Sequence, residues 1–285
     1  MDKYCYTTLR FNPSIFDYKS KISYSKVETV SNNNDIEHNG VRGTIKSYGL
    51  KEGVEISCFS DLPSQTGIGS SSSFVVGLVN AMNRLLYPED TYSSDDLASS
   101  AIYIERKLLK EPGGCQDQIY AAHGGFISIN IDRDGGFNVK PLPISKSFTD
   151  DLFNRSVLVY TGKSRNSFDI ARSHKGNSNK ERIHELALIA YDFFLKENIE
   201  MIASTLHDSW LQKKAISDSI SNTEVDAIYS ELQKLGMIGG KLLGSGGSGF
   251  VFGICKDSAS VSKIKRKFTT VDFAVSKKGS EIINV

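Results

Sequence analysis

A run of glycine and hydroxyl residues stands directly before an apolar helical stretch. The run, residues 63–73, reads Pro-Ser-Gln-Thr-Gly-Ile-Gly-Ser-Ser-Ser-Ser and is called here the glycine–serine loop. Residues 54–59 before it alternate like a half-buried strand, and residues 74–86 after it are apolar at helical spacing. This order directs free N–H groups and the positive end of a helix dipole at an anion. The loop therefore indicates phosphate binding, with a serine-capped helix after an ordinary turn as the alternative.

The glycine–serine loop fits neither of the common phosphate motifs. No Lys-Ser or Lys-Thr pair follows its glycines, which excludes a Walker A loop. Ser72 stands where a dinucleotide fingerprint needs its third glycine.

Two acidic residues are candidates for metal and proton chemistry. Glu105 falls within the apolar stripe of a helix expected from Leu97 to about Lys110, where a carboxylate needs a partner, a cation or a shifted pKa. Asp117 lies between two glutamines in a glycine-broken loop that presents its carboxylate. An edge residue directed to water and a plain turn residue remain the alternatives.

A second glycine-rich segment, residues 244–249, formally matches Gly-x-Gly-x-x-Gly. A Rossmann fingerprint requires a helix next, whereas residues 250–255 are typical of a short apolar strand. This second glycine loop is therefore predicted to be a hairpin that lets a ligand or another loop approach closely, with a merely flexible loop as the alternative.

The remaining pattern predicts an α+β protein in two parts. Strands are expected at 2–10, 22–30, 54–59, 124–130, 136–142, 157–160, 237–243, 250–255 and 270–275. Helices are expected at about 35–48, 70–86, 97–110, 166–174, 180–196, 198–216, 223–235 and 258–268. Prolines and Ser/Asp-rich sequence at 141–151 indicate a junction between domains at 1–150 and 151–285. Trp210 is expected in the core.

Composition narrows the function classes. The chain has 285 residues, 39% of them hydrophobic, and a formal net charge of +1, which argues against nucleic-acid binding through bulk electrostatics. Its four cysteines lie far apart in sequence and are typical of reduced cytosolic thiols. No segment is typical of a secretion signal or a membrane span. We therefore expect a cytoplasmic protein with neither nucleic acid nor membrane as partner.

The glycine–serine loop resembles the second motif of the GHMP kinases, Pro-x-x-x-Gly-Leu-Gly-Ser-Ser-Ala. Ile68 stands for the leucine and Ser72 for the alanine. Residues 241–247 resemble the third motif, which supports the phosphate loop, and the resemblance covers essentially the whole chain. It implies a two-part α+β fold with an N-terminal mixed part (ribosomal protein S5 domain 2-like) and a C-terminal ferredoxin-like part.

The resemblance also implies roles for individual residues in phosphoryl transfer from ATP. Nucleotide-binding residues are implied at Pro63, Gly67, Ile68, Gly69, Ser70, Ser71 and Ser72. Mg²⁺ ligands are implied at Ser70, Ser71 and Glu105, and the catalytic residue is Asp117. Substrate-binding residues are implied at Gln116, Lys163, Arg165, Gly246 and Gly247.

Residues 2–4, 114–118, 121–125 and 161–165 are similar to one branch of the family, which acts on D-glycero-D-manno-heptose 7-phosphate. This implies transfer to a hydroxyl, taken to be the anomeric one, of a sugar phosphate, within nucleotide-sugar biosynthesis. The basic stretch from Lys163 to Lys175, with Arg165 and Arg172, would then grip the substrate phosphate. A solvated loop is the alternative for this stretch.

Two other interpretations stay open. One is a kinase for a free sugar of the fucose or galactose type, which needs no cations for a substrate phosphate. The other is a nucleotide- or sugar-binding remnant without catalysis, because Met1 stands where relatives continue after a first strand and a glycine-rich first motif. The resemblance allows a homodimer but does not fix the oligomeric state.

Overall fold

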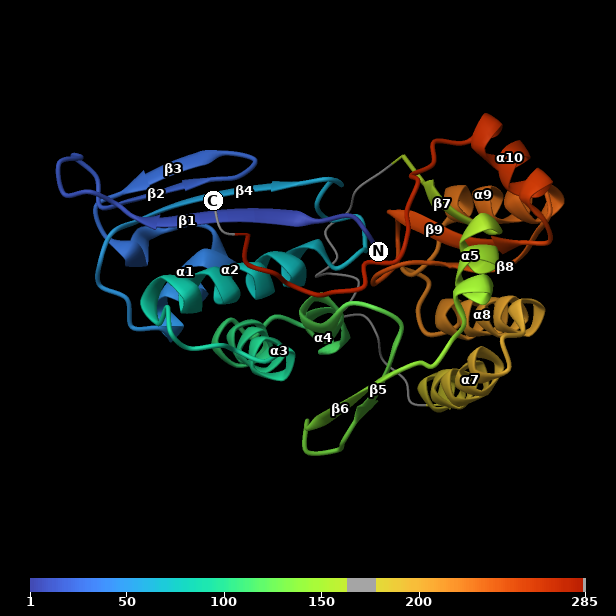
Figure 1. The fold of residues 1–285 in the computed structure, drawn as a ribbon. Helices are drawn as coiled ribbons and strands as arrows, with labels where there is room; N and C mark the ends of the chain where they lie inside the picture. Colours follow the sequence, from blue (N-terminus) through green and yellow to red (C-terminus); the bar gives the residue numbers. More distant parts are fainter. Residues whose placement is uncertain (163–177, 284–285) are drawn as a thin grey trace. The chain divides into compact units, whose positions relative to one another are not determined.

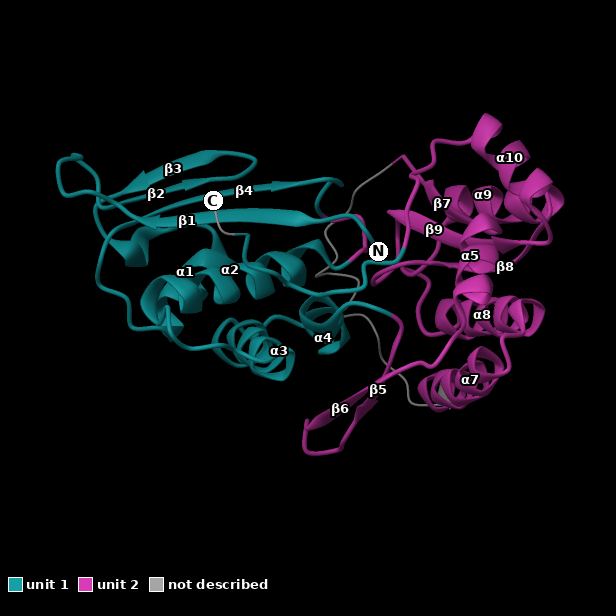
Figure 2. Cartoon of the chain, in the orientation of Figure 1, with its two compact units in different colours: residues 1–64, 69–125, 275–285 teal, residues 65–68, 126–274 magenta. Residues whose placement is uncertain are grey.

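The glycine–serine loop is where the chain passes between two folding units. In the computed structural model, which describes residues 1–162 and 178–283, unit 1 contains Met1–Ser64, Gly69–Gly125 and the described residues from Val275 onward (Figure 2). Unit 2 contains Gln65–Ile68 and the described part of Phe126–Ala274. The loop therefore contributes residues to both units. The domain division expected at 150/151 stays a prediction.

A four-stranded sheet of order β1-β4-β2-β3 forms one layer of unit 1 (Figure 1). Its strands are β1 (Cys5–Phe11), β2 (Ser20–Ser23), β3 (Val27–Val30) and β4 (Val54–Ser60). Strand β4 runs antiparallel to β1 and parallel to β2. Alternate residues such as Val54 and Ile56 are buried, whereas Phe59 is exposed, as expected for a sheet covered on one face.

Helices cover one face of this sheet (Figure 1). They are α1 (Asn39–Ser47), α2 (Ser70–Leu86), α3 (Ser94–Ile102) and α4 (Gln116–His123), together with the short 3₁₀ turn η1 (Asn33–Asp35) and the π-helical turn η2 (Tyr103–Leu108). Helix α2, which contacts β1, buries Phe74, Leu78 and Met82. Ser93 and Asp96 form a capping box at the start of α3.

Unit 2 is built on a three-stranded antiparallel sheet of order β7-β9-β8. Its strands are β7 (Ser156–Tyr160), β8 (Met237–Leu242) and β9 (Phe250–Cys255), and a separate hairpin consists of β5 (Ile127–Ile131) and β6 (Phe137–Pro141). Its described helices are α5 (Lys146–Asn154), α7 (Ser178–Leu195), α8 (Ile199–Lys214), α9 (Thr223–Lys234) and α10 (Ser258–Lys267).

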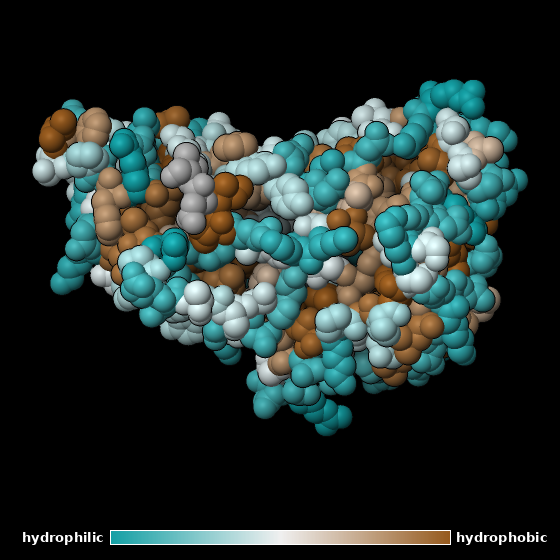
Figure 3. Space-filling view, in the orientation of Figure 1, coloured by the Kyte–Doolittle hydropathy of each residue, from teal (hydrophilic) through white to brown (hydrophobic). Residues whose placement is uncertain are grey.

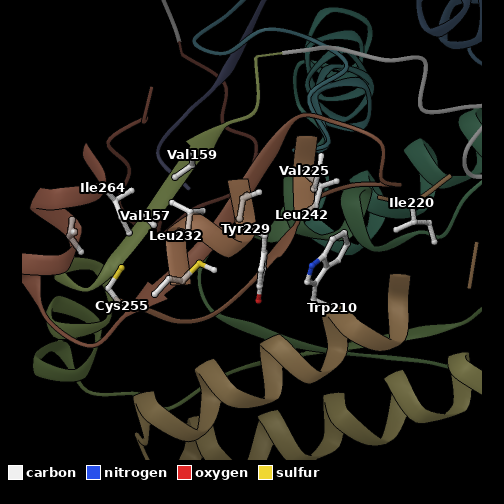
Figure 4. Packing of buried hydrophobic residues seen from close by; sticks show 13 residues of the cluster. Val157, Val159, Trp210, Ile220, Val225, Tyr229, Leu232, Leu242, Cys255 and Ile264 are labelled. Atoms are coloured by element: carbon white, nitrogen blue, oxygen red, sulfur yellow. The ribbon is translucent and has the colours of Figure 1, made fainter. Parts of the chain in front are cut away.

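Apolar side chains pack on both faces of this sheet. One core cluster joins Val157 and Val251 to residues of α9 and α10, and the other joins Ile254 to residues of α5 and α8. Trp210, fully buried as expected, lies in the first cluster beside Tyr229 (Figure 4). The Tyr229 hydroxyl donates to the Gly240 carbonyl at 2.9 Å, so a polar group in this core is satisfied.

Three secondary-structure expectations are wrong, and a fourth segment contains a helix that the sequence did not predict. The strand expected at 22–30 is the β2–β3 hairpin, which turns where Tyr24 N–H donates to the Lys26 carbonyl at 2.8 Å. The junction expected at 141–151 contains helix α5, because the Ser145 side chain caps its start. The helix expected from residue 97 to 110 changes to a π-helical turn at Tyr103. The strand expected at 270–275 is a single bridge between Thr270 and Val159.

The described surface mixes polar and apolar residues. In the view of Figure 3, hydrophobic residues are interspersed among hydrophilic ones. Among the described residues, no helix combines the length and apolar character needed to cross a bilayer.

Candidate functional site

Helix α2 starts without a side-chain cap. Its N-cap is Gly69, which has φ 78° and ψ 20° and forms no side-chain capping bond. Ser73 N–H donates to the Gly69 carbonyl at 2.9 Å, so the N–H groups of Ser70, Ser71 and Ser72 precede the first intrahelical bond. The positive end of a 17-residue helix therefore has donors available for an anion.

Glu105 lies beneath this helix start. Its side chain is buried, at 1% exposure, and its Oε2 atom accepts hydrogen bonds from Ser72 Oγ at 3.0 Å and from Gln118 Nε2. Ser71 Oγ donates to the other carboxylate oxygen at 3.5 Å. The expectation that this carboxylate needs partners is confirmed, and all three partners are neutral.

Burial is the main electrostatic influence on Glu105. It raises the pKa of this carboxyl, while the hydrogen bonds from Gln118 and Ser72 act in the opposite direction. Within the described ranges Glu105 forms no ion pair. A buried carboxylate held by neutral donors is suited to a cation that arrives with a ligand.

Asp117 contacts the same helix start. A Cβ atom built on Gly69 would lie 3.3 Å from Asp117 Cγ, so the carboxyl packs against the Gly69 backbone. Asp117 is not in a loop, as the sequence suggested, but in the first turn of α4, because the helix begins at Gln116. Gln116 itself is exposed. Unit 1 thus brings Gly69, Ser71 and Ser72 together with both predicted carboxylates.

Arg106 holds the segment that joins the two carboxylates, and sequence reasoning missed this residue. Its Nε atom donates to the Gly114 carbonyl at 2.9 Å, and its Nη1 atom donates to the Glu111 and Pro112 carbonyls at 3.3 Å each. The available signal was an arginine beside a candidate acid and shortly before a Pro-Gly-Gly segment, whose irregular backbone offers carbonyl groups to a guanidinium. Gln118 was visible in the sequence, but its bond to Glu105 was not.

The first half of the glycine–serine loop packs against the second glycine loop within unit 2. A Cβ atom on Gly67 would lie 2.7 Å from the Leu243 carbonyl oxygen, and one on Gly249 would lie 2.2 Å from the Thr66 carbonyl oxygen. Side chains at these glycines would therefore separate the two loops. The expectation that the second glycine loop admits another loop is confirmed.

Backbone torsions in the glycine–serine loop alternate. Positive φ angles occur at Gln65 (61°), Gly67 (79°) and Gly69 (78°). Alternation of right- and left-handed conformations is the pattern that turns successive N–H groups toward one anion. Gln65 is not a glycine, and such strain concentrates at functional sites.

Backbone groups of the second glycine loop are hydrogen-bonded to other residues of the chain. Gly247 N–H donates to the Ile220 carbonyl at 2.9 Å, and Asn222 Nδ2 donates to the Gly247 carbonyl at 2.7 Å. A Cβ atom on Gly246 would lie 2.7 Å from Ile220 Cα. These contacts give both glycines a supporting role, and their binding of substrate stays a prediction. Pro63 is exposed, while Lys163, Arg165, Arg172 and Lys175 lie outside the described residues.

The oxygen donors at the α2 start fit a magnesium ion. In the part of the chain that the structure describes, no three His, Cys, Asp or Glu side chains are grouped to hold a metal. Mg²⁺ does not need such a group, because it commonly binds one or two protein carboxylates together with substrate phosphates. The buried Glu105 carboxylate and the Ser71 hydroxyl provide hard oxygen ligands of this kind.

Comparison with known proteins assigns the family. The profile of the GHMP kinases N terminal domain matches residues 38–125, and that of the GHMP kinases C terminal domain matches residues 190–271. The chain belongs to the GHMP kinase family. It is therefore a phosphotransferase of the kinase class, with ATP as the phosphoryl donor of its family, and its two-part α+β fold is the family fold.

The similarity to individual kinases extends over most of the chain. The D-glycero-alpha-D-manno-heptose 7-phosphate kinase of Campylobacter jejuni is 30% identical over 278 residues, which span 92% of this chain and 81% of that protein. The bifunctional fucokinase/GDP-fucose pyrophosphorylase of Arabidopsis thaliana is 24% identical over 75% of this chain and 21% of that protein. A crystal structure of a D-glycero-D-manno-heptose 1-phosphate kinase from Bacteroides thetaiotaomicron has the same fold, with a TM-score of 0.75, 20% identity and coverage of 99% and 89%.

Glu105→Gln tests two effects of the buried carboxylate, its effect on stability and its effect on turnover. Because burial raises the pKa of Glu105, its stabilising contribution is present at low pH and is lost as pH rises through the raised pKa. We expect the free energy of unfolding of the variant, relative to that of the wild type, to be greater at pH 8 than at pH 5 by on the order of 1 kcal/mol. The variant should also lose magnesium-dependent turnover. Urea unfolding at both pH values measures the difference.

The exposed Glu89→Gln is the matched control and should show no such pH-dependent gain. A stability difference between Glu105→Gln and the wild type that is the same at both pH values would contradict the assignment.

Gly249→Ala tests the close approach of the two glycine loops. Gly249 has φ 120°, and a methyl group there would meet the Thr66 carbonyl. We expect a destabilisation that exceeds that of the control by more than about 1 kcal/mol, together with loss of kinase activity. Gly135→Ala is the control, because Gly135 has φ 92° but open space around its Cβ position. Equal effects of the two substitutions would show that only backbone strain matters.

Proposed function

We propose that this GHMP kinase transfers the γ-phosphoryl group of ATP to a hydroxyl, the anomeric one, of a sugar phosphate of the heptose 7-phosphate class. The observation that carries the proposal is the placement of two carboxylates, Glu105 and Asp117, at the uncapped start of α2. The similarity to a heptose 7-phosphate kinase over 92% of the chain supports the substrate class.

The start of α2 would bind the triphosphate. Backbone N–H groups of Ser70, Ser71 and Ser72 and the helix dipole favour negative charge at this point. Phosphoryl transfer depends mainly on positioning and on neutralising charge at the phosphates, so few side chains are required.

Glu105 and the hydroxyls of Ser70 and Ser71 would hold Mg²⁺. When bound, the ion neutralises charge on the β- and γ-phosphates. Glu105 is kept in place by Ser72 and Gln118, so the carboxylate is oriented before the nucleotide binds.

Asp117 would orient the attacking hydroxyl and accept its proton. Its carboxyl packs on Gly69, adjacent to the N–H groups that would bind phosphate. Arg106 fixes the segment before α4 through three carbonyl groups and so positions Asp117. The retention of both carboxylates favours an active kinase over a binding remnant.

Asp117→Asn tests the chemical step. We expect kcat to fall by about 10²- to 10⁴-fold, because proton transfer is lost while the shape of the side chain is kept. Nucleotide affinity should change by less than about threefold, since no phosphate contact is removed. A coupled ADP-release assay gives kcat, and calorimetry gives the nucleotide affinity. The exposed Asp90→Asn should leave both unchanged, and full activity of Asp117→Asn would remove this residue from the chemistry.

A panel of sugars separates the two kinase hypotheses. With Mg²⁺ and ATP, we expect kcat/KM for D-glycero-D-manno-heptose 7-phosphate to exceed that for free fucose or galactose by at least about 10²-fold, because binding a substrate phosphate supplies charge-assisted hydrogen bonds. Phosphorus NMR of the product identifies the phosphorylated oxygen. Preference for a free sugar would favour the fucose or galactose type, a fucokinase being also similar to this chain. Absence of turnover on every sugar would favour the binding remnant.

A further inference from the structure

Two cysteines that are far apart in the sequence meet in the sheet of unit 1. Cys5 on β1 and Cys58 on β4 place their sulfur atoms 3.4 Å apart. All four cysteines are free thiols, so this contact is a hydrogen bond between two thiols. A pair at this separation, both half-buried, needs only a small approach of the sulfur atoms to form a bond.

Hydroxyl groups surround the sulfur pair. Thr7 lies directly opposite Cys58 in the strand register, and Ser60 lies directly opposite Cys5. The Thr7 Oγ1 atom is buried, and the sulfur atoms of Cys5 and Cys58 are acceptors for its hydroxyl. A hydroxyl donates a stronger hydrogen bond to a thiolate than to a neutral thiol.

The two thiols are electrostatically unequal. The hydrogen bond from Cys58, aided by the hydroxyls of Ser60 and Thr7, lowers the pKa of Cys5 to about 7 against the opposing effect of burial. The same contact and burial raise the pKa of Cys58. In the proposal below, we therefore assign Cys5 as the attacking thiol and Cys58 as the thiol that resolves the product.

We propose that Cys5 and Cys58 form a modification site at which a peroxide produces a reversible disulfide. The Cys5 thiolate attacks one peroxide oxygen, which breaks the O–O bond, oxidises the sulfur to a sulfenic acid and releases hydroxide. Cys58 sulfur then attacks the sulfenic sulfur, forms the S–S bond and expels the hydroxyl, which leaves as water with the Cys58 proton. Hydrogen peroxide is reduced to two water molecules in the whole reaction, and a thiol reductant reverses it.

The position of the pair connects it to the glycine–serine loop. Next to the pair, Tyr4 N–H donates to Asp61 Oδ2 at 2.9 Å and Asp61 N–H donates to the Tyr4 carbonyl at 3.0 Å. The chain continues from Asp61 through Leu62 into that loop. The disulfide would covalently join β1 to β4 at the end from which the loop begins.

The other cysteines lack these features. Cys255 is fully buried in unit 2, where burial raises the pKa of its thiol to about 11. Cys115 is half-buried and has no contact with another cysteine sulfur among the described residues. Cys115→Ser is therefore a matched control for a half-buried thiol without a partner.

Peroxide treatment followed by mass spectrometry tests the proposal. One equivalent of hydrogen peroxide at pH 7.5 should lower the mass of the native wild-type chain by about 2 Da, remove two free thiols and link the peptides that contain Cys5 and Cys58. Dithiothreitol should restore both thiols. Cys115→Ser should behave like the wild type, whereas Cys58→Ser should gain about 16 Da at Cys5 and form no intramolecular link.

A bifunctional thiol reagent supplies a second measurement that needs no oxidation. One equivalent of phenylarsine oxide should protect two thiols from modification in the wild type and in Cys115→Ser, but not in Cys58→Ser. Protection that is unchanged in Cys58→Ser would overturn the pairing. A peroxide product that links Cys115 or Cys255, or a stable sulfenic acid at Cys5 in the wild type, would overturn the proposal.

Discussion

The site depends on one buried carboxylate that forms no ion pair among the described residues. Glu105 is 1% exposed and is held by Ser71, Ser72 and Gln118, which are all neutral donors. Removing a carboxylate from water is costly, and hydrogen bonds from neutral groups offset only part of this cost. Such an arrangement reduces stability in the absence of ligand. Under the proposed function, a bound cation would offset the remaining cost, and the carboxylate would be oriented in advance for a metal ion carried by a nucleotide.

Glu105 lies within the π-helical turn η2. The backbone bond from Leu109 N–H to the Ile104 carbonyl, at 2.9 Å, spans five residues, as in a π-helix. Such turns are uncommon and occur frequently at functional sites. The residue after Glu105, Arg106, binds the carbonyl groups that lead to α4, so the segment carrying Glu105 also positions Asp117. The two carboxylates are thereby connected through a short, hydrogen-bonded stretch of chain.

The sequence predicted those parts of the structure that depend on local pattern. Helix α2 starts and ends where the hydroxyl run and the apolar spacing indicated, at Ser70 and Leu86. The β2–β3 hairpin was missed because its turn at residues 24–26 contains neither glycine nor proline, and α5 was missed because its capping Ser145 lies in sequence typical of a linker. The need of Glu105 for partners was predictable from its place on an apolar stripe. The identity of Gln118 as partner was not, because that contact depends on how α4 packs.

The second glycine loop is rich in glycine because another segment of backbone packs closely against it, which the spacing of the glycines does not show. The second glycine loop matches a dinucleotide fingerprint, yet its Gly249 is required because the Thr66 carbonyl occupies the space of a side chain. The strand that follows the loop, β9, favours a hairpin over a dinucleotide-binding loop, because a dinucleotide fingerprint continues into a helix.

A crystal structure with Mg²⁺ and a non-hydrolysable ATP analogue tests the central claim most directly. The account predicts β- and γ-phosphates within hydrogen-bond distance of the Ser70–Ser72 N–H groups, a Glu105 oxygen at about 2.1 Å from the ion, and the Asp117 carboxylate facing the γ-phosphate. A triphosphate bound elsewhere, or an ion coordinated without Glu105, would contradict it.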